Sequence, residues 1–133
     1  MKKVLVFLLV LAMCLGLCSC MSMDDIEDNL GSSYKKESID EDDLEEYAEL
    51  LNIDVEDYEV ESAMMATHKK KGTGVMIVEC GSASLAEELS EDGDGMLDIL
   101  EYTYGSKYTF KIEVEGNFVL FGEKSAIKDA LGE

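Results

Sequence analysis

The sequence predicts an α+β domain over residues 38–133, in which helices and strands follow one another in the order αββαββα. Two observations carry this prediction. Apolar residues recur with helical spacing in three stretches, and between those stretches lie two pairs of strand-like segments joined by short turns. This order is typical of a four-stranded, mainly antiparallel sheet with helices packed on one face. The length is close to the usual size of one domain.

The first helix is predicted over residues 38–53. Ser38 and Glu41 have the spacing of a capping box, and the acids that follow suit the positive end of the helix dipole. Leu44, Tyr47 and Leu51, together with Leu50, form one apolar stripe along this helix. The helix is therefore expected to bury one apolar stripe.

Two strands follow the first helix. Residues 58–68 alternate along the strand, and residues 73–81 form a more continuous apolar run. Between them, Lys69–Lys71 are expected at a hairpin tip, where solvated lysines discourage edge-to-edge aggregation. A second interpretation of these lysines is contact with an anionic wall polymer.

The second half of the domain repeats this order. Helical spacing runs from residue 84 to about residue 104, interrupted by an acidic, glycine-containing break. Alternate residues are apolar in the strand predicted at 107–114, and Gly116-Asn117 is predicted to form a tight turn onto a strand at 118–122. A short helix is predicted over 124–133. We expect one group of side chains to lie in the core or at its margin: Met64, Met65, Tyr102, Tyr104, Tyr108 and Phe110.

The N-terminal residues resemble a bacterial lipoprotein signal. Two lysines precede an apolar run that has the length of a signal peptide and is short for a membrane-spanning helix. Leu17-Cys18-Ser19-Cys20 then resembles a lipobox, which implies cleavage of residues 1–19 and attachment of diacylglycerol to Cys20. Acyl chains of this kind anchor a protein stably, so the chain is expected on the outer face of the bacterial cytoplasmic membrane. The alternative is an ordinary secretory signal with an incidental cysteine.

Residues 20–37 are predicted to be a lipid-anchored flexible tether. Residues 21–37 are polar, contain Gly31-Ser32-Ser33 and show no sustained period. Cys80 is then the single cysteine of the mature chain, so no disulfide framework is expected and the domain depends on its hydrophobic core. Because Cys80 lies in an apolar run, we expect it to be buried.

A second resemblance covers residues 44–131. The stretch "LNIDVEDYEVESAMM", an apolar strand, an acidic helix and "EGNFVLFG" resemble a family of small lipoproteins from Gram-positive bacteria that carry a domain of unknown function. This resemblance implies no activity and no catalytic residues. In that family the middle helix is longer and uninterrupted, so "EDGDG" at residues 91–95 is a departure.

The net charge of the chain limits the kinds of molecule that it can bind. The chain has thirty acidic residues, eleven lysines and no arginine, for a formal charge of −19. Such a surface repels nucleic acid, and without arginine there is no planar fork for bidentate recognition of phosphate. Nucleic-acid binding is therefore not expected, whereas cations and basic partners are attracted.

No residue pattern predicts a catalytic centre. His68 is the single histidine and is expected to be an exposed strand-end residue, with no histidine or cysteine partner for an ordinary zinc site. Ser82 and Ser84 follow a strand, but nothing around them resembles a nucleophile elbow. We therefore expect the protein not to be an enzyme.

Residues 90–101, "SEDGDGMLDILE", have the spacing of an EF-hand calcium loop. That loop takes ligands at its first, third, fifth, seventh, ninth and twelfth positions, with a glycine at the sixth, here Gly95. The ligand positions hold Ser90, Asp92, Asp94, Met96 (through its carbonyl), Asp98 and Glu101. Serine at the first position is a weak ligand, and no second loop is present to pair with this one. The other interpretation is an acidic break in a helix that binds no metal.

Two classes of function stay open from the sequence. The first is a non-enzymatic envelope module, held at the membrane by its lipid, that binds an envelope protein, peptide or polymer. The second is a weak calcium-binding domain in which Ca²⁺ orders residues 90–101. The identity of the partner does not follow from the residues.

Overall fold

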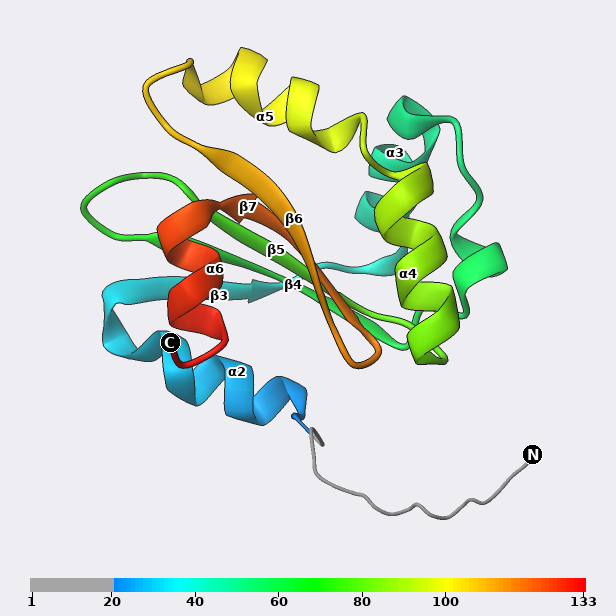
Figure 1. Cartoon of the computed structure of the whole chain (residues 1–133), viewed down its shortest axis with the longest axis horizontal. Helices are drawn as coiled ribbons and strands as arrows, with labels where there is room; N and C mark the ends of the chain where they lie inside the picture. The colour runs from blue at the N-terminus through cyan, green and yellow to red at the C-terminus, as the bar shows by residue number, and fades with distance from the viewer. Residues whose placement is uncertain (1–20) are drawn as a thin grey trace.

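The computed structural model describes residues 21–133, so the predicted signal peptide (1–19) and Cys20 lie outside the described residues. A five-stranded antiparallel sheet runs through the described chain in the order β3-β4-β5-β7-β6 (Figure 1). The strands are β3 (Tyr34–Ser38), β4 (Ser62–His68), β5 (Gly74–Glu79), β6 (Phe110–Glu115) and β7 (Phe118–Glu123). The α+β class and the antiparallel pairing are confirmed, but the sheet has five strands rather than four.

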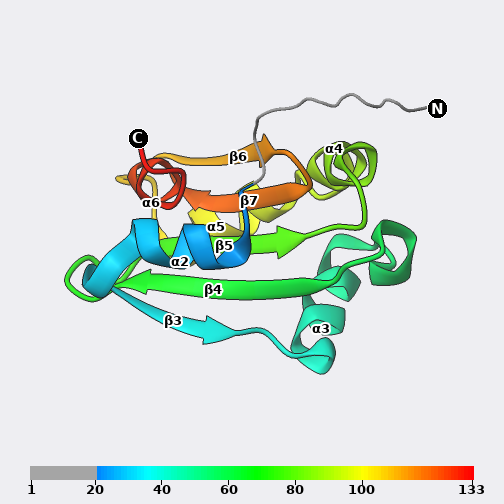
Figure 2. The same ribbon diagram turned by 90° about the horizontal axis from the view of Figure 1, so that it is seen from below.

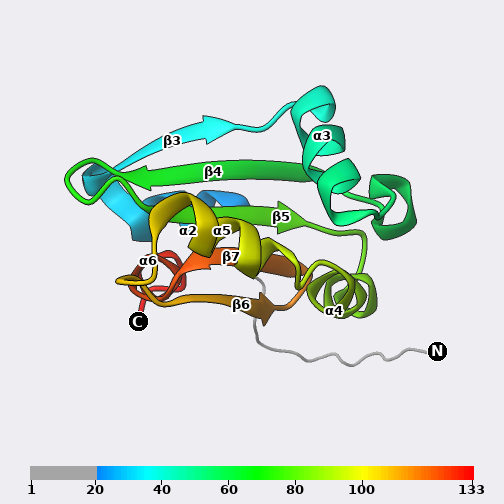
Figure 3. The ribbon, with the colours of Figure 1, turned by 90° about the horizontal axis from the view of Figure 1, so that it is seen from above.

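Helices cover both faces of this sheet, not one face as predicted. The first face carries α2 (Met23–Leu30) and α6 (Lys124–Ala130), and the opposite face carries α3 (Glu41–Leu51), α4 (Ala83–Asp92) and α5 (Met96–Tyr104) (Figures 2 and 3). The physical reason lies in β5, whose four central residues are apolar and buried, and in β7, whose first five residues are buried. A strand that is apolar on both sides needs a covering layer on each.

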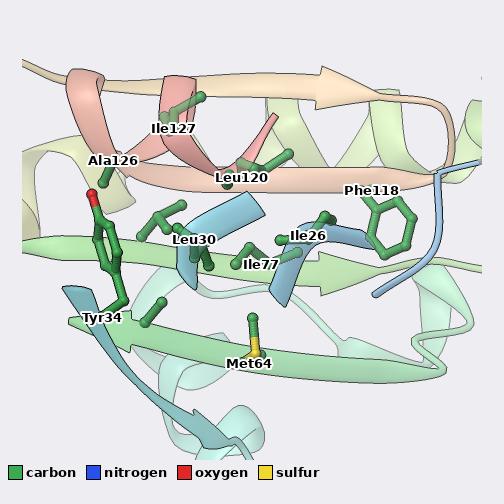
Figure 4. Packing of buried hydrophobic residues seen from close by; sticks show 12 residues of the cluster. Ile26, Leu30, Tyr34, Met64, Ile77, Phe118, Leu120, Ala126 and Ile127 are labelled. Carbon is green, nitrogen blue, oxygen red and sulfur yellow. The ribbon is translucent and has the colours of Figure 1, made fainter. Parts of the chain in front are cut away.

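One core cluster lies between the sheet and the helices α2 and α6 (Figure 4). Ile26 and Leu30 of α2 and Ile127 of α6 point onto the strands, where they meet Ile77 and Leu120. Ile26, Ile77 and Leu120 have no exposed surface. A second cluster on the other face joins α4 and α5 to the sheet, and its buried members include Met76, Val78, Val119, Leu89 and Met96.

The predicted tether is wrong for residues 21–37, because this segment belongs to the domain. Ser22 and Asp25 form a capping box at the start of α2, and Met23, Ile26 and Leu30 recur at helical spacing to reach the core. The chain continues through a short 3₁₀ turn, η1 (Gly31–Ser33), into β3, which pairs with β4 along its whole length. The acids between these few apolar residues hide the helical period in the sequence.

Local boundaries also differ from those predicted. Asp40, not Ser38, caps α3 by accepting a hydrogen bond from the Asp43 amide, since Ser38 is the last residue of β3. Tyr58 lies in a 3₁₀ turn, η2 (Val55–Tyr58), so β4 begins only at Ser62. The interrupted middle helix is confirmed as α4 and α5, and the last helix as α6. Among residues 21–133, no helix is both long and apolar enough to cross a membrane.

The turn between β6 and β7 is the predicted tight turn. Glu115 pairs with Phe118, so Gly116 and Asn117 are its two central residues. Gly116 adopts a positive φ of 59°, whereas Asn117 does not. A glycine at the first central position is typical of a type II′ hairpin. The side-chain amide of Asn117 instead donates to the Cys80 carbonyl at 2.8 Å, which joins this turn to the end of β5.

Candidate functional site

An apolar groove crosses the sheet face between α3 and α5. We call it the α3–α5 groove. Its volume is about 120 Å³. The break at Gly93–Gly95 lets α5 turn across the sheet, while α3 lies near the start of β4 (Figure 3). The groove is lined by Tyr47, Met65, Thr67, Gly74, Met76, Met96, Ile99, Leu100, Thr103, Tyr104 and Phe121.

A smaller cavity of about 40 Å³ beneath α3 adjoins the α3–α5 groove. Tyr47, Met76, Met96 and Phe121 line both spaces. The remaining lining of the inner cavity is almost wholly aliphatic, with residues from α3, η2 and β5. Methionine side chains are flexible and polarizable, so they adapt to apolar groups of different shape. The two spaces together can receive an apolar side chain.

An acidic edge adjoins the groove on the side of β3. Glu37, Asp43 and Glu46, which we call the acidic edge, line a shallow hollow that shares Tyr47 and Met65 with the groove. Leu50 of α3 also lines this hollow and exposes 69% of its surface to solvent. Leu50 is therefore not part of the buried apolar stripe predicted for the first helix. Glu37 is paired with Lys35 at 3.4 Å, so it is chiefly Asp43 and Glu46 that place negative charge beside the apolar opening.

Residues 90–101 form two helices joined by a short turn rather than an open loop. Ser90 and Asp92 belong to the last turn of α4, Asp94 lies in the turn, and Met96, Asp98 and Glu101 belong to α5. The Ser90 hydroxyl donates to the Glu87 carbonyl at 2.6 Å, and a carboxylate oxygen of Asp92 accepts from the Tyr58 hydroxyl at 2.7 Å.

These two hydrogen bonds already engage Ser90 and Asp92, which are the first two predicted calcium ligands. In residues 21–133, no group of three or more His, Cys, Asp or Glu side chains has an arrangement that holds a metal ion. Binding of Ca²⁺ by residues 90–101 stays a prediction, and in this conformation it requires the last turn of α4 to unwind.

The candidate nucleophiles have structural roles. Cys80 is fully buried, and its burial raises the pKa of the thiol to about 11, with a smaller contribution from the nearby Glu79 carboxylate. The prediction that Cys80 is buried is confirmed. Ser82 caps α4, since its hydroxyl accepts from the Leu85 amide at 3.2 Å. Ser84 is exposed in the first turn of that helix.

His68 is half-buried, not exposed as predicted. Its ring nitrogen Nδ1 accepts hydrogen bonds from the amides of Lys70 and Lys71, each at 3.2 Å, and its ring meets that of Tyr34 edge-on at 5.0 Å. The imidazole therefore holds the β4–β5 hairpin turn in place. Lys69–Lys71 are exposed at this turn, as predicted.

The methionine and aromatic side chains predicted to lie in the core or at its margin differ in their burial. Met64 is buried and Met65 is half-buried, as predicted. Tyr104 and Tyr108 pack against Phe110 with ring centres 5.9 and 6.2 Å apart, at the edge of the molecule. Tyr102, in contrast, exposes 93% of its surface, because it lies on the side of α5 that faces away from the sheet.

In comparisons with known proteins, no family model matches the chain, and no curated protein or solved structure shows significant similarity to it. The resemblance to small Gram-positive lipoproteins therefore stays a prediction that rests on short motifs.

Proposed function

We propose that this chain is a lipoprotein anchored through Cys20 to the outer face of the bacterial cytoplasmic membrane, where it acts as a non-enzymatic binding module. The lipobox-like residues before Cys20 support the location. The observation that carries the binding role is the α3–α5 groove with the acidic edge beside it. The partner is a segment of an envelope protein.

The chemistry of the surface defines the segment that fits it. An apolar side chain entering the groove contributes about 1.5–3 kcal/mol when it is fully buried. Lysine or arginine residues beside it face Glu37, Asp43 and Glu46. A chain with a net charge of −19 also attracts basic partners at long range, which raises their rate of association. The proposed occupant is therefore a basic segment with an apolar anchor.

A non-enzymatic role is supported by what the candidate reactive groups do. The single histidine accepts two backbone hydrogen bonds in a hairpin turn, and Ser82 caps a helix. The raised pKa of the Cys80 thiol keeps it protonated at neutral pH, and only the thiolate is an effective nucleophile.

Calorimetric titration of the chain in zwitterionic nanodiscs tests the proposed groove. The ligand is a short peptide with one leucine between lysines, and the comparison is the same peptide with glutamates in place of lysines. We expect the basic peptide to bind and the acidic peptide not to bind. Thr103→Trp fills the groove and should abolish binding, whereas Thr109→Trp, at an exposed position outside the groove, should leave it unchanged.

The acidic edge is tested by a matched pair of charge reversals. Glu37→Lys with Glu46→Lys should weaken binding of the basic peptide about tenfold. Each exposed ion pair that is lost contributes roughly 0.2–1 kcal/mol, and the new lysines repel the lysines of the peptide. Asp28→Lys with Glu133→Lys changes the net charge equally at exposed positions outside the acidic edge. Equal weakening by both pairs, or no effect of Thr103→Trp, contradicts the proposed docking surface.

A further inference from the structure

Charge is divided between the two ends of the molecule. Residues 40–61 contain twelve aspartates and glutamates and no lysine, whereas residues 67–74 and 105–111 contain five lysines and no acid. The first segment comprises α3 and η2, and the other two are the β4–β5 hairpin and the loop before β6, at the opposite end of the sheet (Figures 1 and 3). A protein of strongly negative net charge thus has one positive end.

Backbone contacts join the lysine-bearing segments at this end. The Lys69 amide donates to the Ser33 carbonyl at 2.9 Å, and the Lys124 amide donates to the Thr109 carbonyl at 2.8 Å. The Lys71 ammonium donates to the Ser125 hydroxyl at 3.2 Å, which links the hairpin to the first turn of α6. We call the resulting surface the lysine end, and it consists of Lys69, Lys70, Lys71, Lys107 and Lys124.

The lysines of the lysine end form no ion pairs among residues 21–133. Within residues 21–133, the ion pairs are those of Lys35 with Glu37 and Lys111 with Glu113, and neither includes a lysine of this surface. The Glu123 carboxylate beside Lys124 accepts from the amide and hydroxyl of Ser125 instead. Mutual repulsion of five exposed ammonium groups destabilises the fold slightly, and a bound anion removes that repulsion.

We propose that the lysine end binds a phosphate-bearing polymer of the cell envelope. Lysine binds phosphate as a compact point charge, and because this chain has no arginine, recognition here depends on the charge of the ligand rather than on bidentate hydrogen bonds. The exposed ring of Tyr104 and the half-buried ring of Tyr108 at the same end add a surface for the polymer backbone, and the Lys107 ammonium lies 5.2 Å from the centre of the Tyr108 ring.

The position of the lysine end favours a polymer, rather than the membrane that would hold the proposed lipid anchor, as its ligand. The described chain begins at Met21, before the first turn of α2, whereas the lysine end lies beyond the last turn of α2 and at the start of α6 (Figure 1). A lipid on the residue before Met21 therefore holds a different side of the domain against the bilayer. The lysines are left free to contact material beside it.

Long-chain inorganic polyphosphate is the probe, and its binding to the full chain in zwitterionic nanodiscs is measured by calorimetry. We expect binding to weaken about 50-fold between 50 and 200 mM salt. This value assumes four lysine–phosphate contacts, each of which releases counterions as a phosphate contact on single-stranded nucleic acid does. Lys70→Gln with Lys107→Gln should weaken binding at least tenfold. Lys36→Gln with Lys128→Gln removes the same charge outside the lysine end and should have little effect.

Two comparison ligands complete the test. Polyglutamate should bind more weakly than polyphosphate, and vesicles that contain phosphatidylglycerol should bind the chain more weakly than the polymer does. Polyphosphate should raise the melting temperature of the wild type and of the variant with Lys36→Gln and Lys128→Gln. It should not raise that of the variant with Lys70→Gln and Lys107→Gln. Absence of polyphosphate binding, equal loss in both lysine pairs, or tighter binding to polyglutamate or to the vesicles overturns the proposal.

Discussion

Two buried tyrosine hydroxyls join segments that are distant in the sequence. Tyr58 of η2 donates to Asp92 at the end of α4 at 2.7 Å, and Tyr34 of β3 donates to Asp129 of α6 at 2.8 Å. Burial, the hydrogen bond and the carboxylate charge together raise the pKa of both phenols, that of Tyr58 to about 12. Tyr58 therefore fixes α4 relative to η2, Tyr34 fixes α6 relative to the sheet, and each bond requires a protonated phenol.

Tyr58→Phe should lower the free energy of unfolding at pH 7 by about 1–2 kcal/mol, because a hydrogen bond to a charged group is lost. In the wild type, the folded-state pKa of Tyr58 exceeds the unfolded value of 10. Its contribution is therefore complete below pH 10 and is lost as the pH rises toward 12. Urea denaturation at a series of pH values measures both effects. Tyr102→Phe, at a fully solvated ring, is the control, and an equal loss of stability there contradicts this role of Tyr58.

At the scale of elements, α2 and β3 complete the fold rather than precede it. Ile26 is fully buried beneath the sheet, and β3 supplies one edge strand. The sequence predicts the strand pairs and the broken middle helix well, because periodic apolar runs there extend over many residues. It fails for α2, because three apolar residues among acids carry too weak a period to distinguish a short helix from a tether.

Ile26→Ala should reduce the free energy of unfolding by about 2–4 kcal/mol, as large-to-small changes in a core do. Asp28→Ala, in the same helix but exposed, should change it by less than about 0.5 kcal/mol. Chemical denaturation of the two variants compares them directly. If residues 21–37 were a mobile tether, neither substitution would change the free energy of unfolding. That result would contradict the fold described for this segment.

The β6–β7 turn places different demands on its two central residues. Gly116→Ala should cost about 1–2 kcal/mol of stability, since a Cβ is unfavourable at positive φ. Asn117→Ala should cost about 1–3 kcal/mol, because the Cys80 carbonyl loses its side-chain donor. Asn117→Gly should cost as much as Asn117→Ala, since the amide rather than a positive φ is what the position needs. Thermal unfolding of the three variants tests this, and a harmless Asn117→Gly contradicts it.

The calcium prediction for residues 90–101 is tested at the same scale. Bound Ca²⁺ at about 100 times its dissociation constant adds roughly 2.7 kcal/mol of stability to the folded state. Glu101→Gln should abolish that gain, and Ser90→Asp should enlarge it. Tyr58→Phe should also enlarge it, since it frees the Asp92 carboxylate. A wild-type melting temperature that does not respond to millimolar Ca²⁺ rejects the site.

At the scale of the whole molecule, the binding surfaces arise where distant segments meet. The α3–α5 groove brings Tyr47, Met65 and Leu100 together. The lysine end combines the β4–β5 hairpin with the start of α6, which Lys71 and Ser125 join. Local periodicity does not specify which face of the sheet each helix covers, so the groove could not be located from the sequence. Of the lysine end, the sequence predicted only the hairpin tip at Lys69–Lys71. The signal for the proposed anchor, in contrast, is local, because a lipobox is a contiguous run of residues.

The N-terminal peptide of the protein extracted from bacterial membranes is the most direct test of the proposed lipid-anchored module. Mass spectrometry should find Cys20 as the first residue, carrying diacylglycerol on its sulfur and lacking residues 1–19. Cys20→Ala should remove the lipid and leave residues 1–19 attached. A wild-type protein that begins elsewhere, or that carries an unmodified Cys20, contradicts the account.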